Sequence, residues 1–191
     1  MSMNRSIFLF LAGAALAAAT PLAEARADAE FRRVDGQLRC LDESGGEVYP
    51  PGMDCLRIGP VRIGETLRSV AMKFGKERQK ASRGAVTERV YPIDVGAQPG
   101  QRVPYWVIGF EEQRVVSIQI TGEVRVEQYD FSSIRVGDPE VSVLNRMGVA
   151  GFNQPAPHIN GQLWGYPPYP VTFEIKDGKV YSMRVSEAIG K

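Results

Sequence analysis

The sequence predicts an α+β fold in which two tandem units, each a helix followed by a three-stranded antiparallel meander, form one sheet with both helices on one face. Segments 58–75 and 131–148 align without a gap and share Arg, Gly, Ser, Val and a final Gly at matched positions. Each segment is followed by apolar runs typical of strands, the last two joined by a short polar turn. This self-similarity indicates an internal repeat, with units at 58–122 and 131–191.

The first residues have the pattern of a secretory signal peptide. Arg5 precedes an apolar run from Ile7 to Ala19, and Ala25-Arg26-Ala27 is a small-residue cleavage site. The run is shorter than the roughly 20 residues that a spanning helix needs, so no integral membrane segment is expected. We expect residues 1–27 to be removed and the protein to be periplasmic or secreted, soluble and without a lipid anchor, since its first cysteine lies far from the cleavage site.

A small β-meander is expected over residues 28–57. Asp35-Gly36 is a hairpin signal, and Ser44-Gly45-Gly46 marks a second turn. Cys40 and Cys55 are the two cysteines of the chain, and in an oxidising compartment we expect them to form a disulfide that holds this weak core together. Two free thiols are the alternative.

Glycines punctuate both predicted helices. Gly64 and Gly75 bound the first, whose apolar residues recur with helical spacing at Leu67, Val70, Ala71 and Phe74. The second is predicted over Pro139 to Met147, with Asp138 as N-cap and Gly148 at its end. Helices this short need a sheet to pack on.

Strands are predicted after each helix, at 89–92, 105–110 and 115–120, and then at 162–166, 171–175 and 180–185. Polar turns at 111–114 and 176–179 join the last two strands of each unit. The mixed-charge stretch 76–83 is expected to be a solvated loop, and 153–170 a loop stiffened by prolines. The linker 121–130 could itself be extended.

The pattern of an apolar residue, a glycine, a short helix closed by glycine and an aromatic hairpin resembles outer-membrane assembly lipoproteins of the BamE (SmpA/OmlA) type. Two such units in tandem resemble the secreted β-lactamase inhibitor protein (BLIP) family. The resemblance covers residues 58–121 and 131–187. It implies a protein that acts by contact with other proteins and not by catalysis.

Composition and motifs independently indicate a protein that is not an enzyme. The 23 basic and 22 acidic residues nearly balance, which argues against nucleic acid as a partner. His158 is the single histidine and lies in a predicted loop, so we expect neither a general base nor a metal site, and no cofactor. The pair Glu111-Glu112 falls in a hairpin turn, where charge is usually solvated. Motifs for nucleophilic, phosphate-binding or zinc chemistry are missing from the sequence.

Aromatic side chains crowd onto the predicted strands and the proline-rich loop. Some should cover the helices, and the others would anchor a partner, because Trp and Tyr are frequent interface anchors. The candidates for partner binding are Tyr105, Trp106, Trp164, Tyr166 and Tyr169. The sequence therefore predicts a non-enzymatic interaction module of the bacterial periplasm that binds another envelope or secreted protein, either as an assembly or scaffolding factor or as an enzyme inhibitor. The alternative is a protein that binds carbohydrate or peptidoglycan.

Overall fold

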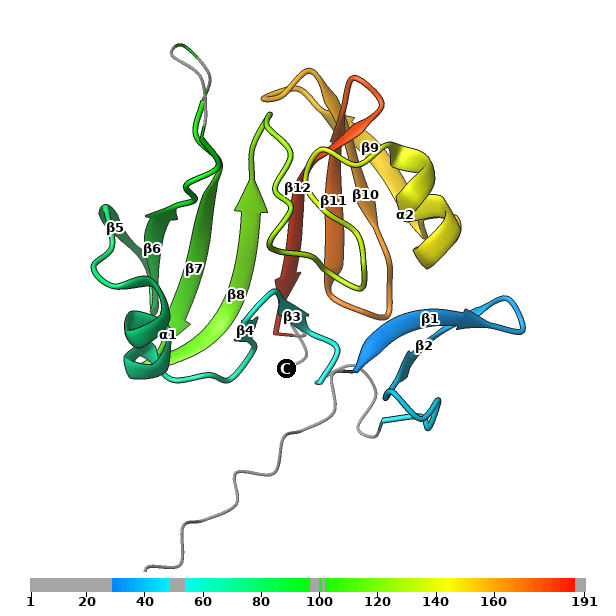
Figure 1. Cartoon of the computed structure of the whole chain (residues 1–191), viewed down its shortest axis with the longest axis horizontal. Helices are drawn as coiled ribbons and strands as arrows, with labels where there is room; N and C mark the ends of the chain where they lie inside the picture. The colour runs from blue at the N-terminus through cyan, green and yellow to red at the C-terminus, as the bar shows by residue number, and fades with distance from the viewer. Residues whose placement is uncertain (1–28, 49–53, 97–99, 101, 188–191) are drawn as a thin grey trace, which may run out of the picture.

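An eight-stranded antiparallel sheet dominates the computed structural model, which describes residues 29–48, 54–96, 100 and 102–187 (Figure 1). The predicted signal peptide, residues 1–27, lies outside the described residues. The strands, in their spatial order, are β5 (Gln79–Arg83), β6 (Val86–Pro92), β7 (Tyr105–Glu111), β8 (Arg114–Thr121), β12 (Lys179–Ser186), β11 (Val171–Lys176), β10 (Gly161–Gly165) and β9 (Phe152–Ala156). The sheet contains two halves, β5 to β8 and β9 to β12, that meet where β8 pairs with β12.

The predicted fold class is wrong. The described chain is mostly β, with two helices, α1 (Leu67–Phe74) and α2 (Glu140–Met147), and a single large sheet in place of two helix-plus-three-strand units. Each helix is followed by four strands and not three. The additional strands are β5 and β9, which form the two edges of the sheet. These strands fall in segments that were expected to be loops.

Edge position explains why sequence reasoning missed both strands. All five residues of β5 are exposed, so no apolar alternation marks it. Strand β9 carries Pro155, which cannot donate a ladder hydrogen bond and is tolerated at a sheet edge. An edge strand is recognised by its neighbour in space, and the sequence does not show that neighbour.

One face of the sheet forms the core. Alternate residues of the central strands point to it and are fully buried; they include Trp106, Ile108, Ile118, Ile120, Phe173, Met183 and Val185. Ring contacts connect this face to two covering segments, α1 and the segment between β8 and α2: Phe74 of α1 lies 5.2 Å from Trp106, Tyr129 lies 4.9 Å from Trp106, and Phe131 lies 5.8 Å from Phe173. These two segments therefore lie on one side of the sheet, and Val143 and Met147 of α2 are buried in the same core.

The N-terminal hairpin also packs on this side. It consists of β1 (Glu30–Val34) and β2 (Gln37–Leu41), and Phe31 is buried between Phe131 and Tyr169 at ring distances of 5.7 and 4.7 Å. The predicted disulfide between Cys40 and Cys55 is confirmed. It links β2 to the start of the small ribbon formed by β3 (Arg57–Ile58) and β4 (Val61–Arg62).

The two halves hold their helices to the sheet by equivalent backbone contacts. In the first half, the N–H of Gly64 donates to Val115 and the N–H of Val115 donates to Glu65. In the second half, Gly137 donates to Val180 and Val180 donates to Asp138. Both glycines have a positive φ, 82° and 89°, which L side chains rarely adopt. In each half, the turn that leads into the helix is thus hydrogen-bonded to the last strand of that half, β8 or β12.

A carboxylate completes each of these turns. The N–H of Arg62 donates to Glu65 Oε2 at 3.2 Å, and the N–H of Arg135 donates to Asp138 Oδ2 at 2.9 Å. Asp138 is therefore not the N-cap that the sequence predicts. Pro139 takes that position, without a side-chain cap, because the Asp138 carboxylate is bound to the preceding turn.

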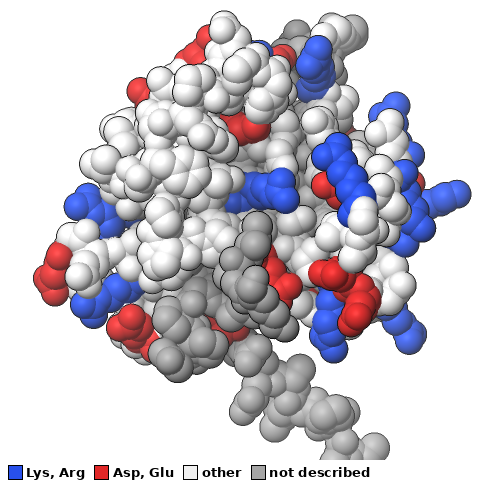
Figure 2. Space-filling model, turned by 180° about the vertical axis from the view of Figure 1, so that it is seen from behind, with Lys and Arg blue, Asp and Glu red and all other residues white. Residues whose placement is uncertain are grey.

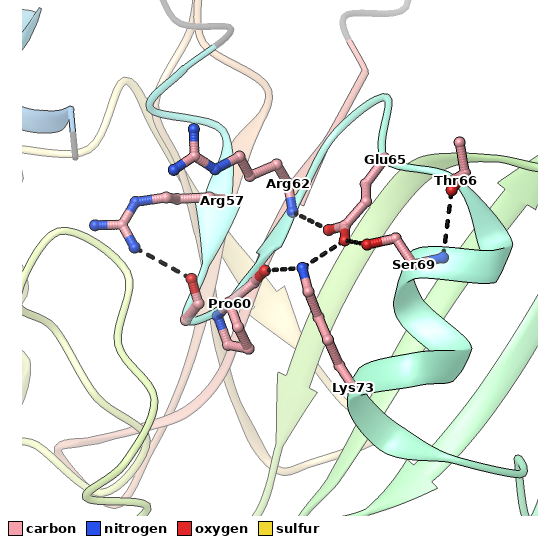
Figure 3. Close-up of polar contacts among 8 residues, drawn as sticks. Arg57, Pro60, Arg62, Glu65, Thr66, Ser69 and Lys73 are labelled. Carbon is pink, nitrogen blue, oxygen red and sulfur yellow. Dashed lines mark hydrogen bonds and ion pairs between the residues drawn. The ribbon is translucent and has the colours of Figure 1, made fainter. Parts of the chain in front are cut away.

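Glu65 also accepts hydrogen bonds from side chains of α1 (Figure 3). Ser69 Oγ and Lys73 Nζ both donate to its Oε1, and Lys73 Nζ also donates to the carbonyl of Pro60 at 2.6 Å. The Glu65 side chain is largely buried, so these donors replace water around its charge. This cluster fastens the helix to the β3–β4 ribbon.

We expect replacement of both Cys40 and Cys55 by serine to lower the free energy of unfolding by about 2 to 5 kcal/mol, because the cross-link restrains the unfolded chain and pins a small hairpin. Chemical denaturation of oxidised wild type and the double variant would measure the loss. Equal midpoints would show that the bridge does not stabilise the fold.

We expect Glu65→Ala to destabilise the protein by about 1 to 3 kcal/mol, since it leaves the backbone N–H of Arg62 and the donors of α1 without their acceptor. Glu111→Ala, at the exposed end of β7, is the matched control and should change stability by about 0.5 kcal/mol or less. Thermal unfolding followed by circular dichroism compares the two. Equal losses in both variants would contradict a special role for Glu65.

Candidate binding surface

The second face of the sheet is the candidate binding surface. None of the described helices or strands packs over it, and we call it the open face. Strand pairing places its residues in cross-strand rows. One row runs Leu163, Glu174, Ser182, Thr121 and Tyr105, and the next runs Phe152, Gly165, Thr172, Arg184, Gln119 and Val107. The middle of both rows lies where β8 meets β12, so both halves of the chain contribute.

A polar network occupies the centre of the open face. The side-chain amide of Gln119 donates to Thr121 Oγ1 at 3.0 Å and to Ser182 Oγ at 2.9 Å. Thr121 Oγ1 in turn donates to Ser182 Oγ at 3.1 Å. Thr121 and Ser182 are buried, so this network is rigid and its groups are held in place before any ligand arrives.

The C-terminal half of the open face is hollowed. The hollow measures about 710 Å³ and has an apolar wall made by Phe152, Leu163, Pro167 and Pro170. The Phe152 ring lies over Gly165, where a Cβ atom would come within 2.0 Å of the ring. Glycine at this position is therefore what lets an aromatic ring lie on the sheet. The ring remains 43% exposed.

Charge on the open face is unevenly distributed. Figure 2 shows the open face, with charged side chains gathered over the β5 and β6 edge and a mostly uncharged surface over the C-terminal half. Within the hollow, Glu174 Oε1 lies 2.7 Å from Nε2 of His158. Arg184 also lines the hollow, and its side chain is exposed.

The structure places Trp106 in the core and not on the open face. Its side chain is 0% exposed, and its ring packs between Phe74 and Tyr129. Its indole N–H is buried and donates to none of the described residues. Trp106 is thus the central ring beneath α1. Tyr105, the preceding residue, points the opposite way and is 37% exposed on the open face.

The three candidates of the second half also face the covering layer. Trp164 is buried and its Nε1 donates to Gln162 at 3.0 Å. Tyr166 is buried, its hydroxyl donates to the Gly148 carbonyl at 3.1 Å, and burial raises its pKa to about 12. Tyr169 is half-buried, and its hydroxyl donates to the carbonyl of Leu38 at 3.2 Å. Of the five predicted residues, Tyr105 is the one on the open face.

Several residues of the open face did not stand out in the sequence. Gln119, Phe152, Leu163 and Arg184 lack any motif, and the prolines around the hollow were assigned to a loop. One sequence pattern could have indicated this face: in β12, the polar residues Ser182, Arg184 and Ser186 alternate with buried apolar residues.

Two further features concern the described part of the chain. No group of three or more His, Cys, Asp or Glu side chains in it could hold a metal ion. None of its helices combines the length and the apolar character needed to cross a membrane.

Comparisons with known proteins show no family. No protein-family model matches the chain, and neither does any curated protein. The crystal structures that align with it include a cysteine-rich secretory protein from Staphylococcus aureus subsp. aureus Mu50 and an extracellular protein containing a SCP domain from Bacillus anthracis str. Ames. Identities are 14% and 13%, each TM-score is 0.43, and the alignments cover 65% of this chain but 43% and 44% of those proteins.

A likeness at this level does not assign the chain to their fold, and the chain spans less than half the length of either protein. The resemblance to BamE-type and BLIP proteins is wrong. The expected units of one helix and three strands are not present, because each helix is followed by four strands and all eight strands belong to one sheet.

We expect Trp106→Ala to cost about 3 to 5 kcal/mol of stability, because it opens a cavity beneath α1. Tyr105→Ala, one residue away on the open face, should cost markedly less. Urea denaturation followed by far-ultraviolet circular dichroism measures both. A small loss for Trp106→Ala would contradict its place at the centre of the core.

Proposed function

We propose that this protein is exported and that it acts without catalysis, by binding another envelope or secreted protein through the open face. It would serve as an assembly or scaffolding factor or as an inhibitor of an enzyme. The observation that carries the proposal is the open face itself, a large sheet surface that both halves of the chain build and that no described helix or strand covers.

Export is supported by the N-terminal sequence pattern and by the disulfide. The run from Ile7 to Ala19 followed by a small-residue cleavage site is typical of a secretory signal. The Cys40–Cys55 bond suits an oxidising compartment, because cytosolic proteins rarely keep structural disulfides.

The surface has the physical properties that protein binding requires. Its hydrogen-bonded centre at Gln119, Thr121 and Ser182 is ordered in advance, which lowers the entropy lost on association. Its apolar wall offers area to bury, and Phe152 is a large exposed ring of the kind that anchors interfaces. A sheet face of eight strands is also wide enough for a typical interface of about 800 Å² on each partner.

Carbohydrate binding is the second candidate. One observation favours it: the exposed Phe152 ring lies in the same hollow as the hydroxyls of Thr172 and Ser186 and the guanidinium of Arg184. A sugar ring could stack on the aromatic ring while the polar groups bind its hydroxyls. A pull-down on immobilised peptidoglycan, with Phe152→Ala as control, distinguishes this function from protein binding.

Site-specific photocrosslinking tests the proposal. A benzophenone amino acid at Tyr105 or Phe152 places the reactive group on the open face, and the same amino acid at Met72 of α1, 75% exposed, is the matched control on the other side. In the cells that make the protein, we expect one discrete protein adduct at both open-face positions and none at Met72. Adducts at Met72 alone, or none at any position, would contradict the proposal.

A further inference from the structure

Arg184 is the basic side chain that lines the hollow of the open face. It lies on β12, with Thr172 of β11 on one side and Gln119 of β8 on the other as cross-strand partners. Its neighbours on the same face of its own strand are Ser182 and Ser186. The direct cross-strand and same-strand neighbours of Arg184 are therefore neutral hydroxyl and amide groups.

No described carboxylate forms an ion pair with Arg184. Glu174 is the acidic residue that lines the same hollow, and it pairs across the strands with Ser182. Its Oε1 is engaged by His158 at 2.7 Å, and its side chain is largely buried. The guanidinium therefore keeps donors available on an exposed surface, in a hollow whose own carboxylate already has a partner.

The apolar wall and Arg184 line the same hollow from different strands. Phe152 lies over Gly165 of β10, and β10 is two strands away from β12 in the sheet. Neighbouring strands are about 4.8 Å apart, so the backbone of Arg184 lies roughly 10 Å from that of Gly165, over which the Phe152 ring lies. In an extended chain, side chains two positions apart point to the same side and lie about 7 Å apart, so such a pair could contact both the apolar wall and the long arginine side chain.

We propose that Arg184 is a carboxylate-binding residue and that the occupant of the hollow is an extended segment of a partner protein. This segment carries an acidic side chain two positions from a large apolar one, so that both point to the same side. The inference rests on the proposed function and deepens it. The guanidinium binds the carboxylate with two parallel N–H donors, and the apolar side chain packs on Phe152 and Leu163.

Selection of a random peptide display library on the folded protein tests the ligand chemistry. The wild type should enrich peptides in which Asp or Glu stands two positions from a large apolar residue. Arg184→Glu should instead enrich Lys or Arg at the acidic position, since the charge of the hollow is reversed. A wild-type selection without an acidic consensus, or the same consensus with both proteins, overturns the proposal.

Affinities of the best wild-type peptide then measure the contact. Arg184→Gln should weaken binding at least tenfold, and Arg184→Lys should give an intermediate loss because it keeps the charge but not the paired donors. Arg68→Gln on α1, an exposed arginine on the other side of the sheet, is the matched control and should bind within twofold of wild type. Equal binding by Arg184→Gln and wild type overturns the proposal, and unchanged melting temperatures show that the variants are folded.

The outcome is separable from that of the proposed function. If photocrosslinks at Tyr105 and Phe152 capture a partner that Arg184→Gln still binds with unchanged affinity, the carboxylate contact is wrong while the open face remains the binding surface. If neither position yields an adduct, the proposed function fails and this inference fails with it.

Discussion

The pairing of β8 with β12 is the interaction on which the rest of this structure depends. It is antiparallel and joins Ser117–Thr121 to Ser182–Ser186, so the last strands of the two halves become the centre of one sheet. On the core face it brings Ile118 beside Val185 and Ile120 beside Met183, all buried. On the other face it brings Gln119 beside Arg184 and Thr121 beside Ser182. Without this pairing, neither the continuous core nor the candidate binding surface would exist.

Burial of one face explains why the other can remain uncovered. The helices, the β3–β4 ribbon, the N-terminal hairpin and the linker before α2 all pack on the same side, and their aromatic rings interlock with those of the sheet. Turn carboxylates hold this layer in place, Glu65 in the first half and Asp138 in the second. Because the apolar side chains are buried on that side, the open face can carry polar side chains and an exposed arginine at little cost to folding.

The candidate site was only partly predictable for the same reason. Aromatic residues on strands signal either core or interface, and the sequence cannot say which face of a sheet will be covered. The covering layer packs on the side of the sheet that carries Trp106, Trp164 and Tyr166, so these side chains are buried. Tyr105 points to the other side. Arg184 and Gln119 are ordinary residues in sequence. They become a possible site when β12 and β8, far apart along the chain, lie side by side.

Local chemistry alone determined the features that depend on near neighbours in the chain. A lone pair of cysteines in a sequence with a signal-peptide pattern was sufficient to predict the Cys40–Cys55 bond. Asp177 and Gly178 adopt positive φ values of 51° and 70°, as their hairpin signal predicts, and glycines end both helices. Only the tertiary structure decided the number of strands, the mostly β class and the composition of the open face. Edge strands and cross-strand rows are defined by partners distant in sequence, and no local pattern records them.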